Sequence, residues 1–188
     1  MDLHQKKLVP FEKYNNFEQL KNSHVYFLHR NEWGIWLATN KGLFLMEEQK
    51  GIIRHYTKEN EALPFHHIKH IHEDQEGAFW LATVDGGIIR WHPDSLQRQK
   101  IPTKQWTIKE GLSHNTTYAI YEDDYGKLWI PSDRGLVCMD KQSERIRIFL
   151  VEDGLPHNEF NTTSHYQAKE GTLFFGGLGG LILSLIHI

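Results

Sequence analysis

Short apolar runs alternating with polar turns fill the chain from about residue 25 to residue 183. Runs such as Ile68–His72 and Thr117–Tyr121 are rich in β-branched and aromatic residues. Each leads into an acidic turn with a glycine, Glu73–Gly77 or Glu122–Gly126, where glycine supplies the positive φ of a tight hairpin. No segment shows the sustained 3.6-residue apolar period of an amphipathic helix. The pattern predicts an all-β protein of short antiparallel strands.

A tryptophan motif recurs along these strands. Trp36-Leu37-Ala38-Thr39 is followed after 44 residues by Trp80-Leu81-Ala82-Thr83, after 49 more by Trp129-Ile130-Pro131-Ser132, and after 45 more by a weaker copy that begins at Phe174. A second motif lies between these copies, and its leucines are separated by steps of 43, 49 and 43 residues: Leu20, Leu63, Leu112 and Leu155. Because both motifs share the longer middle step, we infer one repeat that contains an insertion.

Each period predicts four strands. The Trp strand is followed by a turn that ends in glycine and then by two more strands. The third strand of each period is predicted at Leu43–Met46, Ile88–Trp91, Leu136–Met139 and Leu181–Leu183. The fourth strand is predicted at Ile52–Tyr56, Gln105–Ile108 and Ile146–Val151. Four short antiparallel strands in 40 to 50 residues are typical of one blade of a β-propeller. The segment Lys7–Phe11 is predicted to be the outer strand of a preceding blade.

The predicted fold is an all-β propeller fragment of about three complete four-stranded blades with partial blades at both ends. We assign residues 1–23 to the end of a preceding blade and a linker, 24–66, 67–115 and 116–158 to blades, and 159–183 to a partial final blade. Residues 184–188 resemble translated sequencing-adapter read-through, which leaves a native and a non-native tail as alternatives. Because such an arc leaves two blade faces uncovered, we expect a piece of a longer protein that is poorly soluble or molten when expressed alone.

Composition excludes several classes of function. The chain has 188 residues and a formal net charge of −3, without the basic surface that nucleic acid requires or a Lys/Arg stripe for anionic lipid. Cys138 is the only cysteine, so neither an intrachain disulfide nor a cysteine-built zinc site is expected. No apolar stretch approaches the roughly 20 residues that span a bilayer. The N-terminus also lacks the apolar core of a signal peptide.

One stretch resembles a known family. Residues Glu122–Ile130, followed by Arg134-Gly135-Leu136, are similar to the two-component regulator propeller repeat, and Gly111–Asn115 resembles its link into the next blade. Residues Gly154–Asn161 with Leu173–Gly177 resemble the last blade before a small β-sandwich domain in these sensors. Pro131 departs from the family, which usually has glycine at that position.

The resemblance implies the ligand-sensing, periplasmic propeller of a hybrid two-component histidine kinase held in the inner membrane. It further implies a receptor dimer, an oligosaccharide or other small ligand, and contact with the remainder of the propeller and receptor chain. No nucleic acid, cofactor or direct membrane contact is expected for these residues. Two alternatives stay open: a protein–protein interaction scaffold, or a carbohydrate-active enzyme whose active site lies outside this chain.

The recurring aromatic and histidine residues are interpreted as structural. Trp36, Trp80 and Trp129 occupy one position in every blade, so we expect them in the core between blades. His66, His70 and His72 would share one face of a strand, but no Asp or Glu lies among them. We therefore expect solvated or hydrogen-bonded histidines and no metal site.

Catalytic motifs are missing from the sequence. The acidic residues lie mostly in equivalent blade turns, whereas a glycosidase needs two carboxylates about 5–9.5 Å apart across a sugar. No Gly-x-Ser-x-Gly elbow, His-Glu-x-x-His pair or phosphate loop is present. The hairpin from Asp124 to Trp129 partly resembles that of sialidase-type propellers, where it is structural. We assign no catalytic residue and expect no enzymatic activity from these residues.

One set of positions has the variation expected of a ligand surface. The turns between the second and third strands place Lys41, Asp85, Arg134 and Gly179 at matched positions, four chemistries in a repeat that otherwise recurs. The connections that enter each new blade lie on the same propeller face. We therefore select Lys41, Asp85 and Arg134 as candidate ligand-binding residues, with rim neighbours His114, Asn115, His157 and Asn158.

Overall fold

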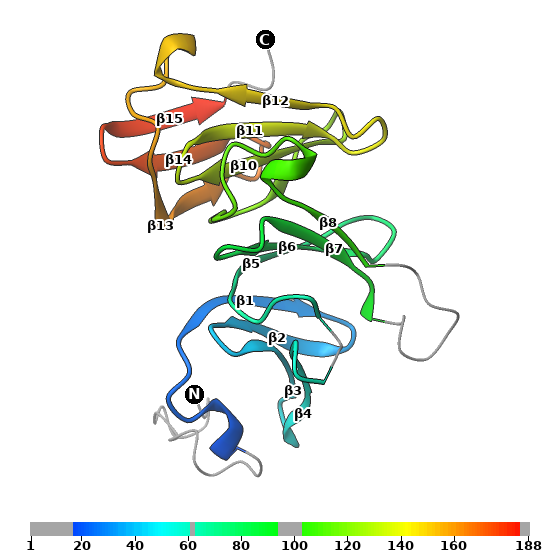
Figure 1. Ribbon diagram of the computed structural model, residues 1–188. Coiled ribbons are helices and arrows are strands. Elements are labelled where there is room, and N and C mark those ends of the chain that lie inside the picture. Colours follow the sequence, from blue (N-terminus) through cyan, green and yellow to red (C-terminus); the bar gives the residue numbers. More distant parts are fainter. Residues whose placement is uncertain (1–16, 61–62, 94–102, 185–188) are drawn as a thin grey trace.

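The computed structural model describes residues 17–60, 63–93 and 103–184. Within these ranges the chain forms four antiparallel sheets joined by loops and short 3₁₀ turns, and it contains no α-helix. Figure 1 shows the sheets following one another in chain order. The prediction of an all-β array of propeller blades is confirmed. The predicted strand Lys7–Phe11 and residues 185–188 of the predicted tail lie outside the described residues.

Each sheet is a meander in which strands adjacent in sequence pair with one another. The first sheet contains β1 (Val25–Asn31), β2 (Gly34–Thr39), β3 (Gly42–Glu47) and β4 (Gly51–Tyr56). The second contains β5 (Ile68–Glu73), β6 (Phe79–Thr83), β7 (Ile88–Trp91) and β8 (Lys104–Trp106). The third contains β9 (Tyr121–Glu122), β10 (Lys127–Ser132), β11 (Gly135–Asp140) and β12 (Ile146–Phe149), and the fourth β13 (Phe160–Gln167), β14 (Leu173–Gly177) and β15 (Gly180–Ser184). The 3₁₀ turns are η2 (Phe17–Leu20), η4 (Ile108–Glu110) and η5 (Val151–Asp153).

The first strands of successive sheets converge, as they do around the axis of a propeller. On β5, the ring of His70 lies 4.0 Å from the ring of Phe27 on β1 and 5.1 Å from the ring of Tyr121 on β9, measured between centroids. The same ring lies 5.1 Å from that of His165 on β13. Residues from all four first strands therefore meet around His70, and we call this side of the sheets the inner rim.

Apolar side chains fill the spaces between neighbouring sheets. Trp36 is fully buried with residues of the first and second sheets, and Trp80 with residues of the second and third. Trp129 is half-buried between the third and fourth sheets. The prediction that these tryptophans form the core between blades is confirmed. Each also stacks on an aromatic residue of its own fourth strand, in the pairs Trp36–Tyr56, Trp80–Trp106 and Trp129–Phe149.

Polar side chains at the turn between the first and second strands form hydrogen bonds with the same tryptophans. The indole Nε1 donates a hydrogen bond to a side-chain oxygen of the turn in each of the first three sheets: Trp36 to Asn31 (3.0 Å), Trp80 to Asp74 (2.9 Å) and Trp129 to Asp123 (2.8 Å). In the fourth sheet, Phe174 takes the Trp position and Ala168 the Asp position. The fourth sheet therefore lacks both the indole donor and its acceptor. This correlation identifies Asn31, Asp74 and Asp123 as structural partners of the core tryptophans.

The glycine after each Trp strand is required by a close backbone approach. Gly87 has φ +68°, and a Cβ added there would collide with the carbonyl of Trp106 on β8. Gly42 and Gly135 also have positive φ, and a Cβ at either would collide with the fourth-strand carbonyl of its own sheet. A side chain at these turns would therefore push the fourth strand away from the third.

Three strands differ from their predicted bounds. The predicted run Thr117–Tyr121 is replaced by the short strand β9, and Thr117 forms only an isolated bridge to Ser132. β8 ends before Ile108 because Thr107 caps η4 and accepts a hydrogen bond from the backbone N–H of Lys109. β12 likewise stops before η5 begins at Val151. Local capping thus ends both outer strands earlier than their apolar residues suggest.

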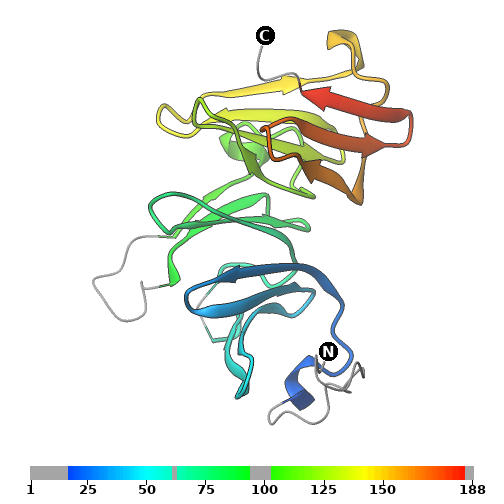
Figure 2. The same cartoon turned by 180° about the vertical axis from the view of Figure 1, so that it is seen from behind.

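Figure 2, from behind, shows the fourth sheet lying in front of the third with no further sheet over it. This sheet has three strands in the described residues. Leu181 and Leu183 on β15 are 59% and 50% exposed, and Tyr166 on β13 is 61% exposed. The free face of the fourth sheet is therefore apolar.

Candidate functional site

The meander topology divides the connections between two opposite faces of the sheets. The turns between second and third strands lie on one face with the segments that join one sheet to the next, and we call this the linker face. The other two hairpins of each sheet lie on the opposite face, which we call the hairpin face. The seven residues selected from the sequence all belong to the linker face.

The three variable turn residues are anchored separately. Lys41 donates from Nζ to the carbonyl of Lys21 (2.8 Å), and Asp85 accepts at Oδ1 from Thr116 Oγ1 (3.2 Å). Arg134 is exposed, and its backbone N–H donates to Ser132 Oγ (3.1 Å). No hydrogen bond or ion pair of the described residues joins one of these three side chains to another. The structure therefore does not gather them into one contact group.

The four rim residues repeat one pattern of hydrogen bonds. Asn115 Oδ1 accepts from the N–H of Ile108 (2.9 Å), and Asn158 Oδ1 accepts from the N–H of Val151 (2.8 Å), the first residue of a 3₁₀ turn in both cases. His114 and His157 each accept at Nδ1 from the backbone N–H two residues later (3.1 and 3.0 Å). These side chains shape the linkers, and their binding of a ligand stays a prediction.

Sequence reasoning missed a different set of side chains on the linker face. The pairing of β1 with β2 shifts between Val25 and Phe27, and that of β5 with β6 shifts between Ile68 and His70, so that Tyr26 and Lys69 are the extra residues of β-bulges. Tyr118 takes the matching place after the Thr117 bridge. Bulges redirect side chains and are frequent beside functional sites. The three residues therefore occupy one redirected position in three successive sheets.

Contacts link these residues into what we call the inner-rim cluster: Tyr26, His67, Lys69, Tyr118 and Asp133. The rings of Tyr26 and His67 stack at 5.3 Å, and a hydrogen bond of 3.0 Å joins the Tyr26 hydroxyl to His67 Nε2. Lys69 Nζ lies 3.8 Å from the centroid of the Tyr26 ring. Tyr118 donates its hydroxyl hydrogen to Asp133, and His114 Nδ1 lies 3.5 Å from the other Asp133 oxygen.

The cluster is half-buried, which perturbs its titrating groups. Burial lowers the pKa of His67, and the charges of Lys69 and His66 lower it further. Burial also lowers the pKa of Lys69, although the Asp133 carboxylate acts in the opposite direction. The pKa of Tyr118 is raised far above its ordinary value by burial and by its hydrogen bond to Asp133. These shifts all disfavour the charged forms of His67, Lys69 and the Tyr118 phenol.

A signal for the cluster was present in the sequence. Lys69 follows Tyr26 by 43 residues and Tyr118 follows Lys69 by 49, the same steps as the leucine motif. One repeat position therefore carries Tyr, Lys and Tyr in successive blades. The bulge that turns these side chains toward one another cannot be inferred from residue types, because the apolar alternation on either side resembles a regular strand.

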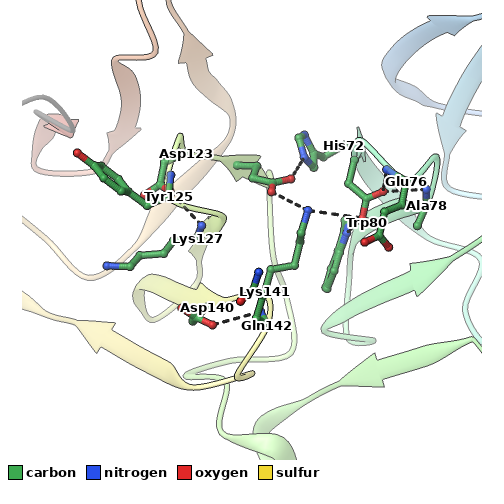
Figure 3. Close-up of polar contacts among 12 residues, drawn as sticks. His72, Glu76, Ala78, Trp80, Asp123, Tyr125, Lys127, Asp140, Lys141 and Gln142 are labelled. Atoms are coloured by element: carbon green, nitrogen blue, oxygen red, sulfur yellow. Dashed lines mark hydrogen bonds and ion pairs between the residues drawn. The ribbon is translucent and has the colours of Figure 1, made fainter.

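The hairpin face carries a groove of about 940 Å³ between the second and third sheets. Lys141 lies at its centre and donates to Glu122 Oε1 (2.6 Å), with Asp74 Oδ2 3.8 Å away on the neighbouring sheet. Glu122 also lies 3.2 Å from Nε2 of His72, which belongs to the second sheet. Figure 3 shows these contacts around Lys141. The groove is acidic, but the charged groups at its centre pair with one another and tie the two sheets together.

The pKa shifts in the groove agree with a structural role. Burial alone would raise the pKa of Asp74, but hydrogen bonds from Trp80 and the backbone, together with the charge of Lys141, hold it below its ordinary value. Burial lowers the pKa of His72, against the opposing influence of Glu122. We therefore take the inner-rim cluster, and not this groove, as the candidate functional site.

The histidine-rich stretch does not present one shared face. His66 is exposed and precedes β5, so only His70 and His72 lie on that strand. His70 is buried and accepts at Nδ1 from the N–H of Ile120 (3.3 Å). In the part of the chain that the structure describes, no three His, Cys, Asp or Glu residues are grouped so as to hold a metal ion. Within the same residues, no helix is long and apolar enough to cross a membrane.

Comparisons with known proteins agree with this architecture. Residues 111–130 match the family described as Two component regulator propeller. The chain is 27% identical over 153 residues to histidine kinase P4 of Formosa agariphila. The aligned region covers 79% of this chain and 11% of that protein. It is 28% identical, with a TM-score of 0.60, to a chain described as the extracellular domain of a hybrid two component system from B. thetaiotaomicron, covering 81% of this chain and 22% of that one.

A second such extracellular domain, also from B. thetaiotaomicron, is 22% identical with a TM-score of 0.65 and shows the same fold over 86% of this chain and 27% of its own. The chain thus corresponds to about a quarter of these solved domains and a tenth of the curated relative. Its sheets superpose on those of these extracellular domains, and the matched residues 111–130 lie where the second sheet leads into the third. The chain is therefore an array of propeller blades that contains a segment matching the two-component regulator propeller repeat and is similar to part of a histidine kinase.

Proposed function

We propose that this chain is a ligand-sensing part of the periplasmic propeller of a bacterial two-component receptor of the hybrid histidine kinase class. The repeat at residues 111–130 and the similarity to extracellular domains of two-component systems support this assignment. In a receptor dimer, the ligand would act by binding one signalling state more tightly than the other, because equal affinity shifts no equilibrium. The remainder of the propeller and the receptor chain would be its partners.

We place the ligand at the inner-rim cluster. The observation that carries this placement is the redirected position shared by Tyr26, Lys69 and Tyr118, which varies in chemistry while its surroundings recur. A purely structural requirement would repeat from blade to blade, as the Trp and Asp positions do. The cluster lies on the linker face, to which Lys41, Asp85 and Arg134 also belong, and these predicted residues are proposed as further ligand contacts.

The chemistry of the cluster favours binding of an oligosaccharide over catalysis. Aromatic rings and a few fixed polar groups are what a ligand site needs for contact area and orientation. Asp133 is the carboxylate of the cluster, and it accepts a hydrogen bond from Tyr118. A glycosidase would need a second carboxylate facing it across the sugar. We therefore propose that these residues bind a sugar and do not hydrolyse it.

Thermal-shift screening of the complete propeller that contains this chain, against a panel of oligosaccharides, tests this function. Any oligosaccharide that raises the melting temperature should bind the Tyr26→Ala and Tyr118→Ala variants at least about tenfold more weakly. Tyr125→Ala is the matched control, because Tyr125 is 71% exposed on the hairpin face. Equal weakening in all three variants, or in Tyr125→Ala alone, would refute the placement, and no shift with any sugar would refute the function.

A protein–protein scaffold is the second candidate, and the free face of the fourth sheet favours it. Leu181, Leu183 and Tyr166 form an exposed apolar surface of the kind that packs against another protein. Light scattering distinguishes the two functions: a scaffold would self-associate or bind a partner through this face regardless of sugar. Substitution of Leu181 and Leu183 by lysine should then abolish association without changing sugar binding.

A further inference from the structure

We propose that the ligand of the inner-rim cluster carries an anionic group, a carboxylate or a sulfate, which binds the ammonium group of Lys69. This inference rests on the function proposed above and adds the charge of the ligand to it. It starts from the hydrogen-bonding state of Lys69, which differs from that of other half-buried charged groups in the described residues.

Lys69 lacks an anionic partner. Its Nζ lies over the Tyr26 ring, and it forms no ion pair or side-chain hydrogen bond within residues 17–60, 63–93 and 103–184. The ring attracts the charge but accepts none of the three N–H groups in a conventional hydrogen bond. Burial disfavours the charged form, and the influence of Asp133 does not overcome this effect. An oxygen anion placed here would supply both the missing charge and the missing acceptors.

Three other half-buried charged side chains in the described residues have a polar partner. Lys41 donates to a backbone carbonyl, Lys141 pairs with Glu122, and Asp133 accepts from Tyr118. The inner-rim cluster therefore gives its carboxylate a hydrogen-bond donor but gives its ammonium group no protein acceptor. A ligand that carries negative charge would supply that acceptor and form an ion pair with Lys69.

The Lys69 ammonium is also held in place. The Tyr26 ring beneath it is fixed by stacking on His67 and by the hydrogen bond of its hydroxyl to the same residue. The charge of the exposed Glu159 reaches Tyr118 and raises the pKa of its phenol. This carboxylate would repel an anionic group bound at Lys69. Removing the Glu159 charge should strengthen its binding.

Calorimetric titration of the complete propeller that contains this chain, with charge-matched sugars, tests the inference. The carboxylate probe is tri-galacturonate, and its control is the fully methyl-esterified trisaccharide, which keeps the ring shape without the charge. The sulfate probe is a sulfated trisaccharide with its desulfated form as control. We expect one acid to bind the wild-type chain at least about tenfold more tightly than its neutral control. The pair that shows the preference identifies the anion.

Variants assign that preference to Lys69. Lys69→Gln should abolish the tenfold preference, Lys69→Arg should retain most of it, and Glu159→Gln should increase it. Melting temperatures equal to wild type show that each variant is folded. A preference that survives in Lys69→Gln overturns the inference. Equal binding of acid and neutral control also overturns it but leaves the proposed sensing function intact. Failure of all four probes overturns it too, while the wider oligosaccharide panel still decides the proposed function.

Discussion

Replacing Asp74 by alanine should strongly destabilise the chain, although Asp74 lies in a polar turn that the sequence presents as solvent-facing. Its side chain is fully buried at the hairpin between β5 and β6. Asp74 Oδ1 accepts hydrogen bonds from the backbone N–H groups of Glu76 and Ala78, both at 3.0 Å. Asp74 Oδ2 accepts from the indole of Trp80 at 2.9 Å. One carboxylate thus closes the turn and anchors a core tryptophan.

The magnitude follows from the donors that lose their acceptor. Ala78 and Trp80 are buried, so their N–H groups would have no water to replace Asp74. A buried donor left unpaired costs about 1–3 kcal/mol. Because losses within one network are not additive, we expect a decrease of about 3–5 kcal/mol in the free energy of unfolding. Asp74→Asn should cost less, about 1–3 kcal/mol, since Asn31 shows that one amide oxygen can accept from both a backbone N–H and an indole.

Urea unfolding of the complete propeller that contains this chain, followed by circular dichroism and tryptophan fluorescence, measures this effect. Asp124→Ala in the next acidic turn is the control, because Asp124 is exposed and forms no side-chain hydrogen bond or ion pair in the described residues. Its change should stay within about 0.5 kcal/mol. A loss below about 1 kcal/mol for Asp74→Ala, or an equal loss for both variants, would refute the assignment of the turn carboxylates as core supports.

Three further predictions concern other parts of the fold. Gly87→Ala should lower the melting temperature well below that of Gly154→Ala. Both glycines have positive φ, but a Cβ would meet a carbonyl only at Gly87, whereas a Cβ at Gly154 would have nothing within 4 Å. Equal decreases in melting temperature would show that the effect comes from backbone strain alone. Stability should fall as pH drops below 6.5, because burial holds the pKa of His70 well below that value and the unfolded chain binds more protons. Urea unfolding across this pH range should show a smaller loss of unfolding free energy for His70→Gln than for wild type. An unchanged loss would exclude His70 as the source of the pH dependence. Replacing both Leu181 and Leu183 by lysine should reduce aggregation measured by light scattering, since both are at least half exposed; unchanged scattering would place the association elsewhere.

Much of the fold could be predicted because its determinants are local and repeated. The Trp motif and the glycine after it recur in phase, and each repetition fixes where a strand crosses the sheet and where the chain turns. The burial of Trp36 and Trp80 follows directly from that recurrence. The ends of the outer strands were less predictable. Ile108 is apolar, but it begins a capped 3₁₀ turn and is exposed, so it does not extend β8. Capping competes with strand pairing over one or two residues, which apolar patterning does not resolve.

The candidate site was harder to predict because it depends on register. Tyr26 and Lys69 lie in runs that look like regular strands, and a bulge in each run decides which face its residue meets. The same bulge separates His66 from His70 and His72, so the expected common face of the three histidines does not form. Asp74 was equally misleading, because the sequence cannot show that an acidic turn folds inward onto an indole.

The two faces of these blades show that acidic or variable residues do not by themselves identify a ligand site. The hydrogen bonds that these residues already form within the fold have to be considered as well. The hairpin face is rich in carboxylates, yet Asp74, Asp123 and Glu122 are used by indoles, backbone N–H groups and Lys141, so their charge is not available to a ligand. On the linker face, Asn115 and Asn158 repeat one capping bond, which accounts for their recurrence without a ligand. Lys69 differs on both counts: it stands where the neighbouring blades have tyrosine, and it has no protein acceptor in the described residues. In a repeat protein, a residue that departs from the repeat and has no partner within the fold is the first candidate for contact with a ligand.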